Sequence, residues 1–319
     1  MKERDKTIDV CKGVGILLVL LGHLPFVFGS VLYTFHMGFF FMLSGYCFSD
    51  KHLEKPFLFI KKRFMSLAFP YLFWVGINKL LIRFVSGYGE FSEQYHLIGT
   101  LWFLRSLFES SLIVFFMLFM LKKLNIQFRK MYLLFALIIL TGLLFLLVGQ
   151  NIANKFYIST FFFIGYCLKS RLYDWSSNLK ISYNSIMVIS SLIVIMLVSP
   201  KYLPLTITFC SEKTYLAYML VSLIGSSVIY IFCRYLAKFK LSDIFVELGQ
   251  NTMPIIIFQW AIFCIVDVLM ENNILYLKSE YVVIVKILSA ISISLFLNII
   301  YKICKHIVFD NLRQITDKQ

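Results

Sequence analysis

The sequence predicts an all-α fold, a polytopic bundle of transmembrane helices built as one domain over residues 1–319. Two properties of the composition predict it. Hydrophobic residues make up 60% of the chain and charged residues 15%, whereas soluble domains average about 45–50% and about 25%. The mean hydropathy is +0.81, and a water-soluble globule cannot bury that much apolar surface. The composition therefore excludes a soluble enzyme, a disordered chain and a small disulfide-rich scaffold.

Ten apolar stretches are candidate membrane spans, because a helix needs about 20 mostly apolar residues to cross the hydrocarbon core. The second and the sixth stretch are short and interrupted by glycine. Lys and Arg alternate with the stretches, so that most of the 31 basic residues lie on the side of the N-terminus. By the positive-inside rule, both termini are then cytoplasmic. The predicted spans are about 13–32, 34–48, 64–82, 99–121, 131–149, 157–170, 183–199, 214–233, 252–270 and 282–301.

The net charge of +14 follows from the same distribution. In a soluble protein it would suggest a nucleic-acid partner, but here the segments on the inner side hold most of it. We therefore expect a lipid bilayer as the partner and no nucleic acid. The seven cysteines occur singly, without a CxxC pair, which indicates neither a metal site nor a disulfide framework.

Two histidines lie in or beside the first two spans, where an ionisable group is costly and so a functional candidate. His23 follows Lys12 by eleven residues, about 16 Å along a helix, which places it near or beyond the middle of the membrane. His36 lies near the outer end of the second span. A short turn around Pro25 and Gly29 joins the two spans, so the histidines can approach each other in the outer half. Histidine suits a base near neutral pH; the alternative for each is a packing role.

Basic residues gather where the first and third spans begin. Lys12 lies at the inner end of the first span, and Lys61, Lys62 and Arg63 precede the third. Clustered cations at an inner membrane surface suit a phosphorylated ligand. The alternative is simple positive-inside anchoring, which is the preferred interpretation of Lys61. No glycine-rich phosphate loop accompanies these cations, so the sequence gives no support for nucleotide hydrolysis.

Other polar side chains occur in the later spans. Arg105 and Glu109 are spaced i, i+4, so they share a helix face and can pair. The pair either binds a substrate or holds the bundle together as a structural ion pair. Asp9 and Asp267 are weaker candidates of the same kind, because both lie near span ends. Gln259 can join helices by hydrogen bonds.

Five sequence blocks, in order, resemble the acyltransferase-3 family of integral-membrane acyltransferases, close to its fucose-4-O-acetylase-like branch. The blocks are IDVCKGVGILLVLLGH, FHMGFFFMLSGY, KKRFMSLAFPY, GTLWFLRSLF and LGQNTMPIIIFQW. Asp9, Lys12 and His23 match the acidic, basic and histidine positions of the first block, with ten residues between the basic residue and the histidine. The resemblance runs through most of the chain.

Two positions depart from the family pattern. Gln259 stands where many relatives have histidine, which puts any catalytic role at that position in doubt. The basic pair of the family is often RxxR, whereas here Ser66 follows Arg63 at the second position. Phosphate contacts would then depend on Lys62 and Arg63, or on fewer groups.

The resemblance implies that acetyl-CoA is the acyl donor, bound from the cytoplasm, and that no metal is needed. The acetyl group would pass to a hydroxyl of a cell-surface polysaccharide or a lipid-linked glycan precursor at a bacterial plasma membrane. His23 would take the proton of that hydroxyl, while Asp9 holds Lys12 in place or orients the donor. The expected site residues are His23, Asp9 and His36 for catalysis, Lys12, Lys62 and Arg63 for the donor, and Trp102, Arg105 and Glu109 for the acceptor.

Two other functions compete with this one. A transporter or flippase for a glycan precursor also fits ten spans with intramembrane charges, although transporters often show repeated halves and none are found here. A sensor or scaffold leaves the buried histidine and the charges unexplained. The acceptor, the length of the acyl group, and O- against N-acylation stay open, and a homo-oligomer is compatible with the chain.

Overall fold

The computed structural model describes residues 5–24, 29–85, 101–126, 129–169 and 207–316. This part of the chain contains helices and turns and no strand, which confirms the all-α prediction for it. The elements are α1 (Lys6–Gly22), α2 (Gly29–Tyr33), α3 (His36–Tyr46), η1 (Asp50–Glu54), α4 (Pro56–Arg63), η2 (Phe64–Ala68), α5 (Phe69–Val85), α7 (Trp102–Lys123), α8 (Lys130–Leu147), α9 (Gln150–Leu168), η4 (Ile207–Phe209), α12 (Tyr215–Leu236), α13 (Ser242–Gln250), α14 (Thr252–Glu271) and α15 (Ser279–Thr316).

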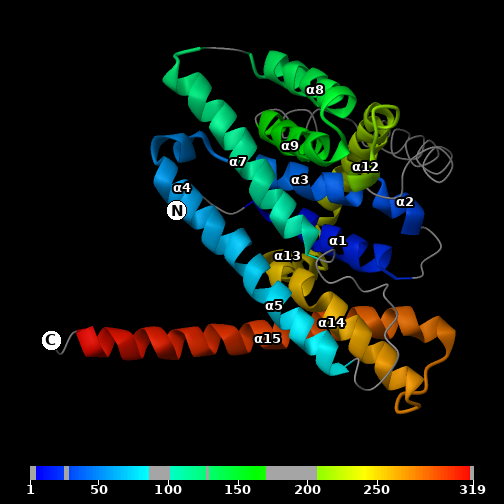
Figure 1. Cartoon of the computed structure of the whole chain (residues 1–319). Coiled ribbons are helices and arrows are strands. Elements are labelled where there is room, and N and C mark those ends of the chain that lie inside the picture. Colours follow the sequence, from blue (N-terminus) through cyan, green and yellow to red (C-terminus); the bar gives the residue numbers. More distant parts are fainter. Residues whose placement is uncertain (1–4, 25–28, 86–100, 127–128, 170–206, 317–319) are drawn as a thin grey trace.

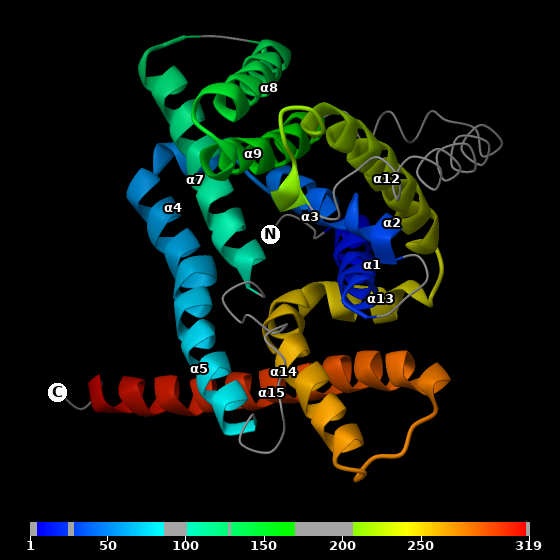
Figure 2. The ribbon, with the colours of Figure 1, turned by 45° about the vertical axis from the view of Figure 1, so that its right-hand side comes forward.

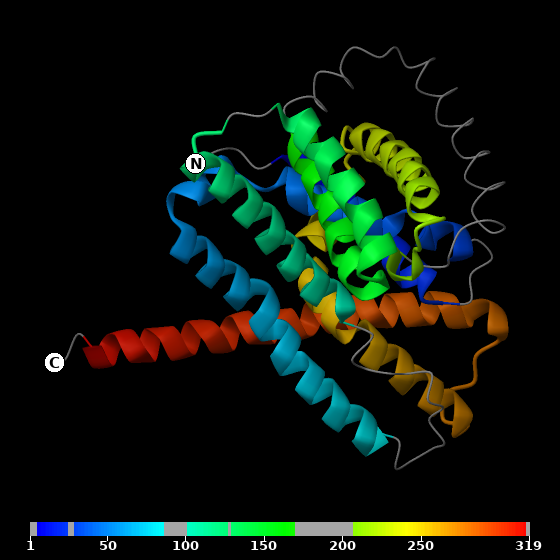
Figure 3. The ribbon, with the colours of Figure 1, turned by 45° about the horizontal axis from the view of Figure 1, so that its top comes forward.

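α1 and α3 lie beside α9, α12 and α13 in the bundle (Figures 1 and 2). α1 packs along α13 and α12, and α3 packs along α9, which also contacts α7 and α8. α14 packs against α15. The C-terminal part of α15 projects beyond the rest of the described chain, as Figure 3 shows. The short helices α1 and α3 therefore have protein on most sides.

Five described helices are long and apolar enough to cross a membrane. They correspond to the predicted spans at about 99–121, 131–149, 214–233, 252–270 and 282–301. The total of ten spans and the cytoplasmic position of both termini stay predictions. The predicted span 183–199 lies outside the described residues. The five helices are Trp102–Lys123, Lys130–Leu147, Tyr215–Leu236, Thr252–Glu271 and Tyr281–Ile299.

The first helix differs from the predicted span 13–32 at both ends. It begins at Lys6 because the Asp5 side chain accepts a hydrogen bond from the Thr7 amide, an N-cap that extends the helix by two turns. It ends at Gly22, shortly before Pro25, since the residue before a proline disfavours helical backbone. His23 is therefore the C-cap of α1 and not an interior residue of a longer span.

The third predicted span is part of a longer continuous helix. α4, η2 and α5 follow one another without a break from Pro56 to Val85, and Pro56 occupies the first turn, where its missing N–H costs nothing. η2 is a π-helical turn, a local widening that is frequent at functional sites. It lies directly after Arg63, at the position where the basic family motif departs from RxxR.

Glycine allows two helix pairs in the interior to approach closely. A Cβ added to Gly13 would collide with the backbone carbonyl of Phe245, so α1 and α13 depend on its absence. A Cβ on Gly165 would collide in the same way with the backbone of Met42 and push α9 from α3. Small residues at helix crossings are the usual means of close packing in membranes. These two contacts fix the positions of α1, which ends next to His23, and of α3, which begins at His36.

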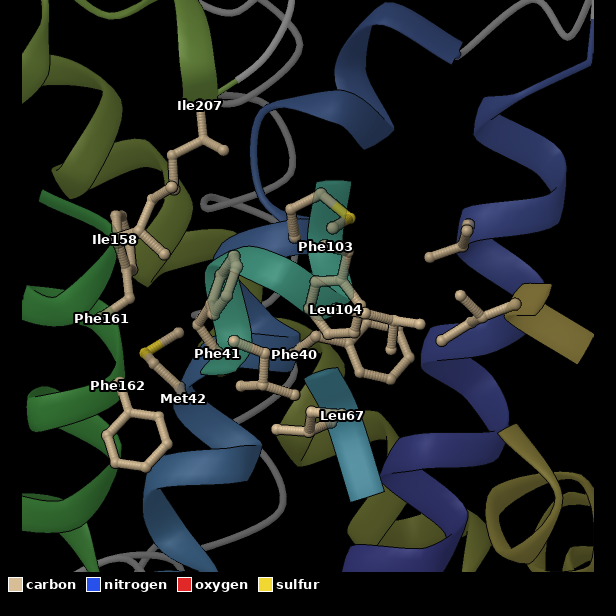
Figure 4. Close-up of a cluster of buried hydrophobic side chains, with 14 of the residues drawn as sticks. Phe40, Phe41, Met42, Leu67, Phe103, Leu104, Ile158, Phe161, Phe162 and Ile207 are labelled. Carbon is tan, nitrogen blue, oxygen red and sulfur yellow. The ribbon is translucent and has the colours of Figure 1, made fainter. Parts of the chain in front are cut away.

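The largest hydrophobic cluster joins α3, α7 and α9. Phe40 and Phe41 of α3 meet Phe103 of α7, with ring centroids 5.6 Å and 5.1 Å from it. Phe161 and Phe162 of α9 are fully buried on the other side of α3 (Figure 4). Buried aromatic pairs of this kind hold their rings in defined geometries. The cluster thus packs around the first turns of α3 and restricts their movement.

An ion pair joins the last two apolar helices. Lys286 Nζ of α15 lies 2.5 Å from Asp267 Oδ1 of α14, and the two side chains are 10% and 25% exposed. Pairing lowers the cost of two charges among apolar helices. The pair lies away from the histidines in sequence and favours a structural role for Asp267.

Candidate active site

The two histidines meet around Tyr33, the last residue of α2. His23 Nδ1 and Tyr33 Oη lie 2.7 Å apart, within hydrogen-bond distance. The Tyr33 ring makes edge contacts with both imidazoles, with centroids 5.8 Å from His23 and 5.1 Å from His36. Tyr218 of α12 donates a hydrogen bond of 2.6 Å to the Tyr33 carbonyl. The expected approach of the two histidines is therefore found, and Tyr33 mediates it.

Both histidines line one cavity, whose empty space of about 460 Å³ includes open solvent. Its wall comes from α1, α3, α7 and α14, together with Tyr33. Most of the lining is apolar, and its polar groups are few and grouped. That composition is usual for a small-molecule site. The lining residues are Val19, His23, Tyr33, His36, Met37, Phe40, Trp102, Phe103, Ile256 and Gln259.

The environment of His36 fixes which ring nitrogen carries the proton. Nδ1 lies 2.6 Å from the carbonyl oxygen of Leu32. Because a carbonyl oxygen only accepts, Nδ1 must donate, and the neutral ring then keeps its lone pair on Nε2. His36 is fully buried, and Nε2 has no hydrogen-bond partner among the described residues. His36 therefore has a buried, unpartnered proton-accepting nitrogen in a residue that lines the cavity.

The surroundings of His23 allow either tautomer, because a phenol can donate or accept. The Trp260 ring of α14 packs on the imidazole with a centroid distance of 4.8 Å. Tyr33 and Trp260 thus hold the ring of His23 in place from two sides. If Nδ1 donates to Tyr33, Nε2 is left as the proton acceptor.

The predicted acceptor-binding residues do not all lie at the cavity. Trp102 lines the cavity, but Arg105 and Glu109 do not. Arg105 Nε donates to Glu109 Oε1 over 3.0 Å, and its side chain is 55% exposed. Lys155 of α9 lies 3.5 Å from the same carboxylate. Glu109 therefore links α7 to α9, which supports the structural alternative for this pair.

Asp9 and Lys12 lie on the half of α1 that is remote from the cavity. Lys12 Nζ is 3.8 Å from Asp9 Oδ1, and Asp9 is 2% exposed. Fourteen residues of helix and cap separate Asp9 from His23, about 21 Å along the axis. Asp9 and His23 are therefore too far apart to touch one reacting centre, and a catalytic role for Asp9 stays a prediction. The position still suits Asp9 as a partner that holds Lys12.

A second group of cations lies at the Tyr46 end of α3. The Arg63 guanidinium lies 5.5 Å from the centroid of the Phe59 ring. Burial lowers the pKa of His52, and the charges of Arg63, Lys169 and Lys62 lower it further, which places these cations around one imidazole. Lys169 Nζ donates to the Phe48 carbonyl. We call His52, Lys62, Arg63 and Lys169 the basic cluster.

The basic cluster and the cavity lie at opposite ends of α3. That helix has 11 residues, about 16 Å. Lys62 and Arg63 both belong to the basic cluster, and Lys12 pairs with Asp9 on α1; the binding of the donor by these three residues stays a prediction.

Several residues at these two places were not among the predicted site residues. Tyr33 belongs to the VLYTFH stretch that ends at His36, but a tyrosine between two apolar spans gives no chemical signal by itself. His52 and Lys169 lie in segments assigned to the inner side, far apart in sequence. Gln259 was interpreted as helix glue, yet it lines the cavity. Only the folded chain brings these residues to the two ends of α3.

Within the described ranges, no group of three His, Cys, Asp or Glu side chains could hold a metal ion. The polar side-chain groups of the residues that line the cavity are imidazole, phenol, indole and amide groups.

Comparison with known proteins shows the family to which the chain belongs. Residues 5–302 match the family model described as an acyltransferase domain. Nodulation protein NolL of Sinorhizobium fredii is 33% identical over 135 residues, which are 35% of this chain and 36% of that protein. Nodulation protein NolL of Mesorhizobium japonicum is 31% identical over 134 residues, 35% of each chain. The match spans about a third of these relatives, and no solved structure matches the chain. Because the family model covers nearly the whole chain, the protein belongs to the acyltransferase-3 family, whose members transfer acyl groups.

Proposed function

We propose that the protein moves an acetyl group from acetyl-CoA to a hydroxyl of a cell-surface polysaccharide or lipid-linked glycan precursor in the bacterial plasma membrane. The observation that supports this best is the cavity lined by His23 and His36 in a chain of the acyltransferase-3 family. The names of the two relatives indicate a biological process, nodulation, and no acceptor. The sugar acceptor is inferred from the resemblance to the fucose-4-O-acetylase-like branch.

In the proposed reaction, His23 acts as the general base. Its Nδ1–H donates to Tyr33, and Nε2 takes the proton of the acceptor hydroxyl. The hydroxyl oxygen attacks the thioester carbonyl, and the tetrahedral intermediate collapses with cleavage of the C–S bond. The imidazolium returns its proton to the leaving thiolate, so the products are the acetyl ester and CoA. General base catalysis of this kind contributes about 10²–10⁴-fold.

The basic cluster is the proposed site for the CoA phosphates. Arginine and lysine bind phosphate by charge-assisted hydrogen bonds, and Arg63 and Lys62 are the family-matched members. CoA carries its phosphates and its thioester at opposite ends of a long flexible arm. A ligand of that shape suits two sites separated by the length of α3. Asp9 acts by keeping Lys12 in position near the remote end of α1.

A transfer assay with purified protein tests the proposal. Wild-type protein in nanodiscs should release free CoA from acetyl-CoA, faster when a glycoside acceptor is added. His23→Ala should lower that turnover at least a hundredfold, because it removes the base. Asn272→Ala, at an exposed position after α14, is the control and should keep wild-type turnover.

Two results would contradict the proposal. Wild-type turnover by His23→Ala would remove His23 as the base. Movement of a labelled glycan precursor across proteoliposomes without release of CoA would favour the transporter alternative, since transport requires no thioester cleavage.

A further inference from the structure

We infer that His36 and Gln259 form a hydroxyl-binding subsite that selects an acceptor with at least two hydrogen-bond donors. This inference rests on the proposed function for the identification of the ligand as an acyl acceptor. It concerns recognition at one wall of the cavity and not the choice of the base.

The first observation is that two buried polar groups in one cavity lack partners. Gln259 is 1% exposed and His36 is fully buried. Among the residues that the structure describes, neither Gln259 Oε1 nor His36 Nε2 has a hydrogen-bond partner. Both side chains line the cavity. Buried polar groups nearly always have a partner, so two unpartnered atoms on residues that line one cavity point to a ligand that supplies it.

The second observation is the chemical character of the two unpartnered atoms. His36 Nε2 accepts, because Nδ1 donates to the Leu32 carbonyl. Gln259 Oε1 is a carbonyl oxygen and also accepts. The ligand must therefore carry donors. A thioester carbonyl and its sulfur only accept, whereas a sugar presents several O–H groups. The wall fits the acceptor better than the reacting end of the donor.

The third observation is where the two residues come from. His36 begins α3, and Gln259 lies two turns into α14, so they approach the cavity from separate helices. α14 also supplies Trp260, which packs on His23. A hydroxyl group held by Gln259 is thereby next to the helix segment that supports the proposed base. Gln259 is thus a specificity-determining residue at the position where many relatives have histidine.

The closing experiment uses the full-length protein in detergent and Gln259→Leu, a variant of similar volume without the amide. The probes are methyl fucoside, methyl rhamnoside and methyl glucoside, with tetrahydropyran as the ring that has no hydroxyl. Wild-type protein should bind at least one glycoside, measured by thermal shift, and should not bind tetrahydropyran. Gln259→Leu should weaken that binding about tenfold. Gln250→Leu makes the same exchange at an exposed position and should bind like wild type.

Two further readouts separate recognition from structure. Gln259→Leu should melt, without ligand, at or above the wild-type temperature, because it removes an unpartnered buried amide. The KM for acetyl-CoA should stay unchanged, and Gln259→His should restore part of the glycoside affinity by returning an acceptor nitrogen.

Three results would overturn the inference: no glycoside binding by wild-type protein, a clear loss of thermal stability in Gln259→Leu, or an effect on the KM for acetyl-CoA in place of glycoside affinity. The last result would mean that His36 and Gln259 bind the amide groups of the donor. If wild-type protein binds a glycoside but cleaves no acetyl-CoA, the proposed function is refuted, whereas the inference of a hydroxyl-binding subsite still holds.

Discussion

The hydroxyl of Tyr33 lies 2.7 Å from Nδ1 of His23, although a turn and the short helix α2 separate the two residues in the chain. The backbone of Tyr33 is held in turn by the hydroxyl of Tyr218. A base works only if its free nitrogen faces the substrate, so a partner held next to the other nitrogen sets the direction of the ring.

Tyr33→Phe should therefore lower kcat for acetyl transfer about fivefold to tenfold, the worth of one hydrogen bond that orients the base. The KM for acetyl-CoA should not change, because the basic cluster is remote from Tyr33. Steady-state kinetics on purified protein measures both constants. Tyr132→Phe, on the exposed side of α8, is the control. An unchanged kcat in Tyr33→Phe would show that the hydroxyl does not orient His23.

Arg63→Ala should raise the KM for acetyl-CoA about tenfold or more while kcat changes little, because a charge-assisted bond to phosphate contributes about 1.5–3 kcal/mol. Lys61→Ala is a matched control, since Lys61 is an exposed neighbour on the same helix, and its KM should stay within about twofold of wild type. Dephospho-CoA derivatives extend the test. A KM equal to that of wild type in Arg63→Ala would place the phosphates elsewhere.

The pH dependence of stability tests the position of His52 in the basic cluster. Its pKa is lowered from 6.5, first by burial and then by the charges of Arg63, Lys169 and Lys62. The unfolded chain, where the pKa is ordinary, binds more protons below about pH 6.5, so the free energy of unfolding falls as the pH drops through that range and levels off below the folded-state pKa. His52→Gln should flatten this dependence in thermal melts from about pH 7 to about pH 5. An equal slope in both proteins would contradict the placement of His52 among these cations.

Gly165→Ala should destabilise the fold by about 1–3 kcal/mol, the usual cost of overpacking. The added Cβ would collide with the backbone of Met42 and separate α9 from α3. Gly76→Ala in α5 is the matched control, since a Cβ there meets nothing within 4 Å. Melting temperatures of the two variants in one detergent decide the comparison. Equal stability would mean that α3 and α9 do not need close contact.

The sequence by itself determined the class of the protein. The apolar fraction predicts a helical membrane bundle, and the description of five suitable helices agrees with it. The five ordered blocks predict the family that the domain match establishes. The fold class and the family can be predicted without a structure because they depend on composition and on the spacing of residues along the chain. Helix ends were predicted less well: α1 begins at Lys6 and ends at Gly22 because of a cap and a proline, which hydropathy does not register.

Only the tertiary structure decided which polar residues meet. Spacing brings Arg105 to Glu109 on one helix, but it cannot show that Lys155 joins them or that the pair lies outside the cavity. Nor can it place Gln259 with His36, or Lys169 with Arg63, since these pairs come from helices far apart in the chain. The physical reason is that side chains on different helices are brought together by packing. The contacts of Gly13 with α13 and of Gly165 with α3 set the positions of α1 and α3, and hence of the two histidines at their ends.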